Sequence, residues 1–214
     1  MSLEDEVNGK QSRRLIRKSL KLGWKLGMAA ATTALSAWAL SLLGASASLG
    51  IVVGAGFAGG GMLGNLARGK SLYNSLDAAL TTYSAVNMVI PHMVWLGQAT
   101  FPLIPNYDIA GKILRTAYAM TAYNAVFLST FKGAGHLVDN YLNPKGIGET
   151  VKKNFWRDFA LIGGLFGLFY GLDANNIAKI AMYHPWTGYF AAPTFAWGAP
   201  PVGFLHNYIT GAKK

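Results

Sequence analysis

Side chains that could do acid–base or metal chemistry are sparse in this sequence, and their spacing matches no known catalytic arrangement. The chain has four histidines and no cysteine, which excludes disulfides, thiolate metal sites and cysteine nucleophiles. His136 and Asp139 are three positions apart, but a metal site needs a third converging ligand. The motifs of serine hydrolases, zinc proteases and P-loop proteins are missing. We therefore expect no catalytic activity, no bound metal and no cofactor.

His92 is the titratable residue with the most unusual surroundings. It follows Pro91 in an uncharged stretch over residues 78–107. Proline lacks a backbone donor and leaves a carbonyl of the preceding turn free, and a neutral histidine could bond to that broken backbone. Alternatively, an ionisable group inside a membrane helix marks a proton or ligand site. Pro91, His92 and Pro193, in the last apolar segment, are therefore candidate pore or proton-site residues.

The segments that would position these groups are strongly apolar. Of the 214 residues, 52% are hydrophobic and 13% are charged, about half the charged fraction of a typical soluble domain. No charged residue occurs from Leu26 to Ala67, and a bilayer-spanning helix needs about 20 apolar residues. This run accommodates two spans joined by a turn at Gly44–Ser48. We predict an all-α, polytopic transmembrane helical bundle of about six spans.

The predicted spans follow the apolar runs of the sequence. They cover residues 26–43, 49–66, 78–104, 116–131, 158–171 and 180–205. The fifth would be about 21 Å long, short of the roughly 30 Å hydrocarbon core, so it either begins earlier, near Phe155, or is re-entrant. A basic amphipathic segment, residues 1–25, precedes the transmembrane domain, residues 26–205, and a basic tail, residues 206–214, follows it.

The net charge of +10 is distributed unevenly. Sixteen of the nineteen Lys and Arg residues lie in the two tails and in the segments following the second and fourth predicted spans. Those regions share one side of the membrane if both termini are cytosolic, and cytosolic loops carry such an excess of cations. We therefore expect a multi-pass membrane protein with both termini on the cytosolic side. The cations flank apolar runs, which makes nucleic acid an unlikely partner.

The basic segment before the first span has a helical pattern. Leu15, Ile16 and Leu20 alternate with cations, which is typical of an amphipathic helix lying on a membrane surface. The alternative is a partly helical basic stop. A cation near anionic headgroups contributes about 1 kcal/mol, so the lipid bilayer is the first expected partner. The predicted headgroup-contacting residues are Arg13, Arg14, Arg17, Lys18, Lys21 and Lys25.

Glycines recur at intervals of four residues in the second and fifth predicted spans. Residues four apart share a helix face, so such a series forms a groove in which another helix packs closely. That helix belongs either to the same chain or to a second subunit. The predicted helix-packing residues are Gly50, Gly54, Gly56, Gly60, Gly64, Gly163, Gly167 and Gly171.

These features favour a non-catalytic subunit of an oligomeric membrane assembly, associating with itself or with other membrane subunits. A channel or transporter with a path around Pro91, His92 and Pro193 is one alternative. A self-assembling coat or filament protein associated with lipid is another. Asn-Tyr pairs at residues 106–107, 140–141 and 207–208 also suggest an internal duplication, although the preference of tyrosine for membrane interfaces explains them equally well.

Overall fold

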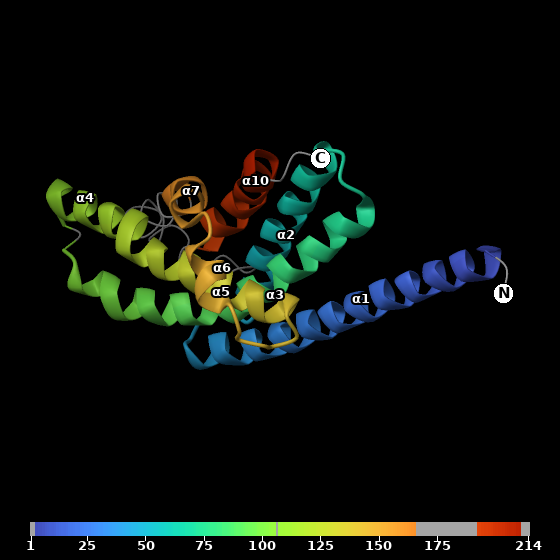
Figure 1. Cartoon of the computed structure of the whole chain (residues 1–214). Coiled ribbons are helices and arrows are strands. Elements are labelled where there is room, and N and C mark those ends of the chain that lie inside the picture. Colours follow the sequence, from blue (N-terminus) through green and yellow to red (C-terminus); the bar gives the residue numbers. More distant parts are fainter. Residues whose placement is uncertain (1–2, 106, 166–191, 211–214) are drawn as a thin grey trace.

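The computed structural model of the chain describes residues 3–105, 107–165 and 192–210, and these residues contain helices and no strand. The all-α part of the prediction is confirmed. The helices are α1 (Leu3–Leu42), α2 (Leu49–Ala67), α3 (Leu72–Thr100), α4 (Ile109–Tyr118), α5 (Asn124–Asp139), α6 (Ile147–Lys152), α7 (Phe155–Asp158) and α10 (Ala192–Thr210) (Figure 1). Three short segments of 3-10 or π-helix accompany them: η1 (Phe101–Leu103) between α3 and α4, η2 (Ala119–Tyr123) between α4 and α5, and η3 (Phe159–Gly163) after α7.

The main helices form a bundle around α2 and α3. Helix α2 packs against α10 and α3, while α3 also packs against α1 and α5. The short α6 lies on α5. The N-terminal part of α1 extends well beyond the other helices as an arm (Figure 1).

Helix α1 contains both the basic amphipathic segment, which was expected to lie on the membrane surface, and the first predicted span. It is one continuous helix of 40 residues, about 60 Å long at 1.5 Å per residue. No proline interrupts residues 12–42, so nothing in the backbone separates the basic segment from the apolar run. The chain then turns at Gly44, whose φ of 69° suits glycine, and α2 begins at Leu49, where the second span was predicted.

The other helix boundaries depart from the predicted spans in places. Helix α3 stays helical across Pro91, so the helix is not interrupted there. Helix α4, the π-helical turn η2 and α5 follow one another without a break over residues 109–139, a longer segment than the predicted 116–131. The segment between the fourth and fifth predicted spans, residues 132–157, contains the end of α5, all of α6 and most of α7.

The described part of α10 runs from Ala192 to Thr210 and includes Pro193. Pro200 and Pro201 lie inside the helix. The residues 207–208 belong to α10, whereas Asn140 follows the last residue of α5 and Tyr141 has a φ of 55°. These two Asn-Tyr pairs therefore occupy different structural positions, which is contrary to the duplication hypothesis.

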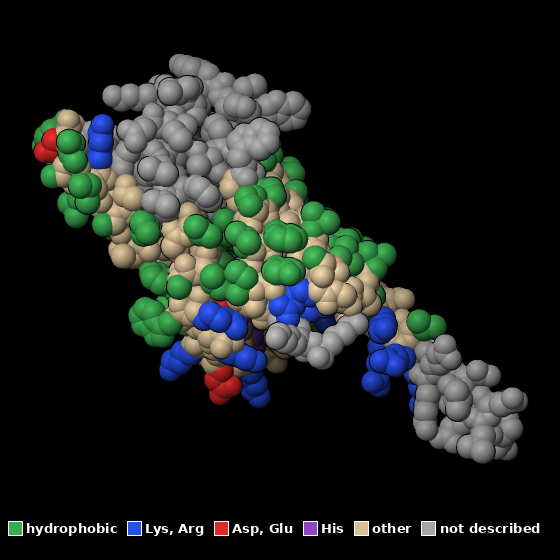
Figure 2. Space-filling view, turned by 90° about the horizontal axis from the view of Figure 1, so that it is seen from above, with side chains coloured by type: hydrophobic (Ala, Val, Ile, Leu, Met, Phe, Trp, Pro, Cys, Tyr) green, Lys and Arg blue, Asp and Glu red, His purple; other side chains and the backbone are tan. Residues whose placement is uncertain are grey.

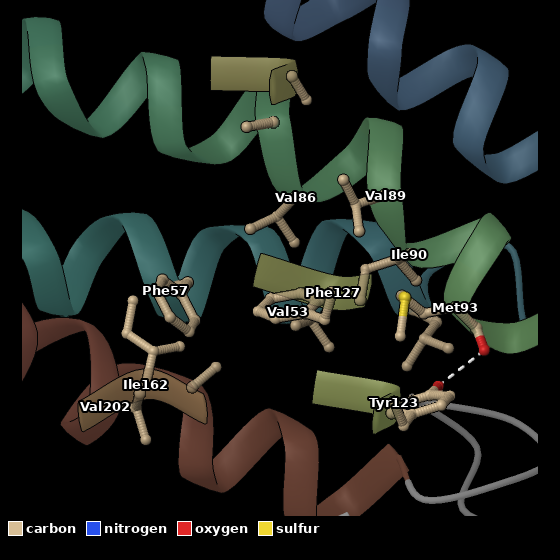
Figure 3. Packing of buried hydrophobic residues seen from close by; sticks show 14 of the residues in the cluster. Val53, Phe57, Val86, Val89, Ile90, Met93, Tyr123, Phe127, Ile162 and Val202 are labelled. Atoms are coloured by element: carbon tan, nitrogen blue, oxygen red, sulfur yellow. Dashed lines mark hydrogen bonds between the residues drawn. The ribbon is translucent and has the colours of Figure 1, made fainter. Parts of the chain in front are cut away.

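The core lies where α2, α3, α5, η3 and α10 meet (Figure 3). Val53 and Phe57 of α2 pack between Val86 of α3 and Val202 of α10, with Ile162 completing the cluster. The buried Tyr123 hydroxyl donates a hydrogen bond of 2.7 Å to the carbonyl of Met93. That bond satisfies the polar end of an aromatic side chain whose ring is otherwise in apolar contact.

Helix α2 is long and apolar enough to cross a membrane, and none of the other described helices meets the same criterion. More than half of α2 is buried inside the bundle, as it also would be in the core helix of a soluble protein. The described residues therefore contain one candidate membrane span, and they do not confirm the predicted bundle of six.

Candidate functional site

The most distinctive site is a group of charged residues where α1, α3 and α5 meet. The ammonium group of Lys25 lies 2.9 Å from Asp77 Oδ1 and 2.6 Å from Asp139 Oδ1. Lys25 is only 1% exposed, although it was expected to face lipid headgroups. A buried ammonium needs paired carboxylates to offset its desolvation, and α3 and α5 each supply one.

Neighbouring contacts fix the rotation of α1 about its axis. Lys21 forms a 2.9 Å ion pair with Asp77 Oδ2. The indole of Trp24 donates to the carbonyl of Val138 over 2.8 Å, and the Thr81 hydroxyl donates to Asp139 over 2.9 Å. One turn of α1 is therefore attached to both α3 and α5. We call Lys21, Lys25, Asp77 and Asp139 the ionic joint.

The charge state of the joint follows from these contacts. Burial disfavours the ionised form of Asp77, but the hydrogen bonds and charges of Lys25 and Lys21 outweigh it and lower the pKa of Asp77 below its ordinary value. Burial also opposes the charge on Lys21, and its bond to Asp77 reverses that effect and raises its pKa. Each partner stabilises the charged form of the other.

The N-terminal arm of α1 places further cations beside the start of α3. A shallow pocket there is lined by Arg13, Arg14, Arg17, Lys18, Lys21 and Tyr73. The Lys18 ammonium lies 4.8 Å from the centre of the Tyr73 ring, within the range of a cation–π contact. Five of the six predicted headgroup-contacting residues therefore share one pocket, and Lys25 lies deeper, in the ionic joint.

A second charged group lies around Asp158. Its carboxylate is 2.7 Å from the Lys132 ammonium and 3.0 Å from Arg157, and His206 of α10 lies 3.5 Å away. These contacts join α5, α7 and α10.

The contacts of His136 separate it from Asp139, with which it was considered as a ligand pair. Its Nε2 lies 2.8 Å from the carbonyl of Lys145 and its Nδ1 lies 2.8 Å from the Thr150 hydroxyl. Since a carbonyl only accepts, Nε2 donates and Nδ1 accepts. His136 thus connects α5 to α6. Within the described residues, no three His, Asp or Glu side chains are arranged to hold a metal ion.

The candidate pore residues belong to two helices, with Pro91 and His92 on α3 and Pro193 on α10. The side chain of His92 is exposed on α3, with its ring 5.9 Å from that of Trp95. Pro91 lies within the same continuous helix, and the side chain of Pro193 is outside the described residues. A path lined by His92 would therefore run along the outside of this chain, between it and a neighbour.

The glycines of α2 meet helices of the same chain. A Cβ on Gly60 would overlap the carbonyl group of Pro200, and one on Gly64 would lie 2.6 Å from the carbonyl oxygen of Phe204. A Cβ on Gly56 would lie 3.1 Å from the Pro200 ring. This contact, which we call the glycine joint, leaves no room for even a methyl group.

The remaining predicted packing glycines fall into two sets. A Cβ on Gly50 would lie 2.6 Å from Asn87 Oδ1, and one on Gly54 would lie 2.8 Å from Asn87 Nδ2. Both therefore pack against α3, within the chain. The side-chain surroundings of Gly163 and the whole of Gly167 and Gly171 lie outside the described residues.

The ionic joint was not anticipated from the sequence, although one signal for it exists. Lys25, Thr32 and Ser36 are separated by seven and four residues, so they share one face of a helix. All three are buried. Reading the polar positions of α1, instead of its apolar ones, would have identified the face that points inward.

No protein-family model, curated protein or solved structure matches this chain.

Proposed function

We propose that this chain is a non-catalytic, multi-pass membrane protein that serves as a subunit of a larger membrane assembly. One observation carries the proposal: over residues 32–42 of α1, burial is inverted relative to a helix in water, with the fully buried Leu40 as the large apolar exception. Leu35, Trp38 and Leu42 are 64%, 64% and 70% exposed, while Thr32 and Ser36 are 4% and 2% exposed.

A hydrocarbon environment explains this inversion. In water, large apolar side chains that face outward forgo the stabilisation that burial would give them, and monomeric proteins rarely expose such extended patches. In a bilayer, apolar groups gain nothing by moving inward, whereas polar groups are best placed between helices. The Thr32 hydroxyl donates a hydrogen bond to the carbonyl of Met28 in the same helix, so it needs no partner from another helix in lipid.

Helix α3 supports the same interpretation. Its buried face holds the polar Ser75, Ser84 and Asn87, with exposed fractions of 1% or less, together with apolar core residues such as Val86, whereas Trp95 is 53% exposed and Met88 is 37% exposed. Figure 2 displays hydrophobic side chains over the middle of one face of the molecule, with most of the visible Lys and Arg side chains along one edge and on the arm.

The contacts of the cations give the bundle a basic end. Lys21 reaches the start of α3, Lys25 reaches the end of α5, and the Arg68 guanidinium after α2 donates to the carbonyl of Tyr208 in α10. These residues come from segments that the charge distribution assigns to the cytosolic side. Fewer cations follow the other end of α3, where Arg115 donates to the carbonyl of Ile104 and Lys112 lies nearby in the sequence. Such an asymmetry favours a fixed orientation in a membrane with the basic end in the cytosol.

The assembly part of the proposal rests on which faces remain available. The predicted packing glycines of α2 contact other helices of the same chain, so an intersubunit contact through them would require the bundle to open. The outward faces of α1 and α3 are apolar and carry Trp38 and Trp95. We therefore assign the subunit contact to these faces, with lipid covering the rest.

Particle mass tests this proposal. The full chain, purified in mild detergent, should give masses in native mass spectrometry that are multiples of 22.9 kDa plus bound lipid. Trp38→Ala and Trp95→Ala should reduce the multimers. Trp156→Ala, on α7 and 77% exposed, is the matched control and should leave them unchanged. Monomers at every protein concentration would contradict the assembly role.

A further inference from the structure

We infer that the pocket between the arm of α1 and Tyr73, which we call the arm pocket, is a specific binding site for the phosphate of an anionic membrane lipid. The site lies between the cationic face of α1 and Tyr73 at the start of α3. This inference rests on the proposed membrane location and adds a defined site to it, in place of diffuse attraction between basic residues and a charged surface.

The first argument is unbalanced charge. Every ionisable side chain in the pocket lining other than Tyr73 is Lys or Arg. Of these lining cations, Lys21 forms an ion pair, with Asp77, and the others form none with any side chain that the structure describes. Arg13 and Arg17 are four residues apart, as are Arg14 and Lys18, and like charges at that spacing destabilise a helix. A bound anion would relieve this repulsion.

The second argument is preorganisation. The ionic joint and the Trp24 bond to Val138 hold the rotation of α1, and the Tyr73 hydroxyl donates to the carbonyl of Lys18 over 3.3 Å. The arm's cations are therefore kept beside α3. Because the part of α1 that lines the pocket is already helical and held in orientation, binding of a ligand needs to order little of the backbone. This lowers the entropic cost of binding and favours affinity. Guanidinium groups also present paired donors that match phosphate oxygens.

The third argument identifies the source of the phosphate as a lipid. The other face of the same arm carries Leu15, Ile16 and Leu20, which are 58%, 56% and 68% exposed. Leu72, beside Tyr73, is 63% exposed. A soluble phosphate has no use for apolar neighbours, whereas a phospholipid places its acyl chains against them while its headgroup lies among the cations.

A lipid-binding experiment with a charge-matched control tests the site. The full chain in mild detergent is titrated with phosphatidylglycerol or phosphatidylcholine, and bound lipid is counted by native mass spectrometry. R13Q/R14Q/R17Q removes three pocket cations but leaves the ionic joint intact. K145Q/K152Q/K153Q removes three exposed cations elsewhere. The melting temperature of each variant establishes that it is folded.

We expect the preference of the wild type for phosphatidylglycerol to fall at least tenfold in R13Q/R14Q/R17Q, since each cation near a headgroup contributes measurably. The control should retain it. Tyr73→Leu should weaken binding about two- to fivefold, because it removes the cation–π contact. An equal loss in both triple variants, or in neither, would overturn the site.

A competition experiment separates the lipid from a free phosphate. Glycerol phosphate and inorganic phosphate, at the concentration that saturates phosphatidylglycerol, should not displace the lipid. Displacement by either at that concentration would overturn the lipid assignment. A chain that spans bilayers while its lipid preference is independent of the arm would contradict this inference alone. A chain that fails to insert would contradict the proposed function, and the detergent titration would still report on the pocket.

Discussion

The ionic joint and the glycine joint attach helices to the bundle in opposite ways. At the ionic joint, Lys25 of α1 reaches two carboxylates on α3 and α5 through a long side chain. At the glycine joint, Gly60 and Gly64 of α2 bring the backbone of α10 into direct contact. The ionic joint requires oppositely charged side chains, whereas the glycine joint requires residues that have no side chain.

The position of each joint explains its chemistry. The ionic joint lies at the basic end of the bundle, where Asp139 remains 47% exposed, so polar groups can be partly hydrated. The glycine joint lies along α2, the candidate membrane span among the described helices, where close backbone contact maximises dispersion without requiring any polar group. The two joints should therefore respond to different substitutions.

The largest effect is expected at the glycine joint. Gly60→Ala should destabilise the folded chain by about 2 kcal/mol or more, because the new methyl group meets the Pro200 carbonyl and the backbone must move. The measurement is the melting temperature of the purified chain in mild detergent.

Gly59→Ala is the matched control for that substitution. Gly59 is the preceding residue of the same helix, and a Cβ there meets nothing within 4 Å. This variant should be neutral or up to about 1 kcal/mol more stable, since alanine favours the helix. Equal melting temperatures for the two variants would show that α2 and α10 do not pack as described.

An intermediate effect is expected at the ionic joint. Asp77→Asn leaves the buried Lys25 with one carboxylate and should cost about 2–3 kcal/mol, less than a fully buried pair because Asp77 is 17% exposed and Asp139 remains. Asp108→Asn is the control. Asp108 is exposed and caps α4 by accepting a hydrogen bond from Gly111, a role that asparagine also performs. An equal loss of stability in Asp108→Asn would mean that the ion pairs of Asp77 do not stabilise the fold more than an exposed helix cap does.

The smallest effect is the pH dependence of the same joint. The pKa of Asp77 is lower in the folded chain than its ordinary value of 3.8, so its ionised form stabilises the fold above about pH 4. This contribution is lost as the pH falls through the lowered pKa. The difference in melting temperature between the wild type and Asp77→Asn should therefore shrink between pH 5 and about pH 2. A difference that stays constant over this range would contradict the assignment.

The sequence was informative where a signal is local and silent where it is not. The apolar run and Gly44 predicted the start of α2 and the turn before it. The spacing of Gly56, Gly60 and Gly64 predicted a close helix contact but not its partner, because a glycine groove accepts any smooth helix face. Lys25 was misassigned since its carboxylate partners are far away along the chain and only the fold brings them together.

The continuity of helices was also misjudged from local signals. Pro91 suggested a broken helix, yet α3 continues through it, because the neighbouring helices hold the backbone in place and one missing hydrogen bond is tolerated in a packed bundle. The basic segment suggested a helix that lies on the membrane surface and leads into the first span. Composition changes sharply at Lys25, but helix propensity does not, and α1 continues through that boundary.

Accessibility from the two sides of a membrane tests the central claim most directly. The chain has no cysteine, so single cysteines can be introduced at Ala47, Ile109 and Lys153, which are all exposed, and at the outward-facing Leu35. In cells, a membrane-impermeant maleimide should label Ala47→Cys and Ile109→Cys at once and Lys153→Cys only after permeabilisation. Leu35→Cys should stay unlabelled in both conditions because it faces lipid or a neighbouring subunit. Equal labelling of Ala47→Cys and Lys153→Cys in intact cells, or rapid labelling of Leu35→Cys, would contradict a bundle that crosses the membrane with its basic end in the cytosol.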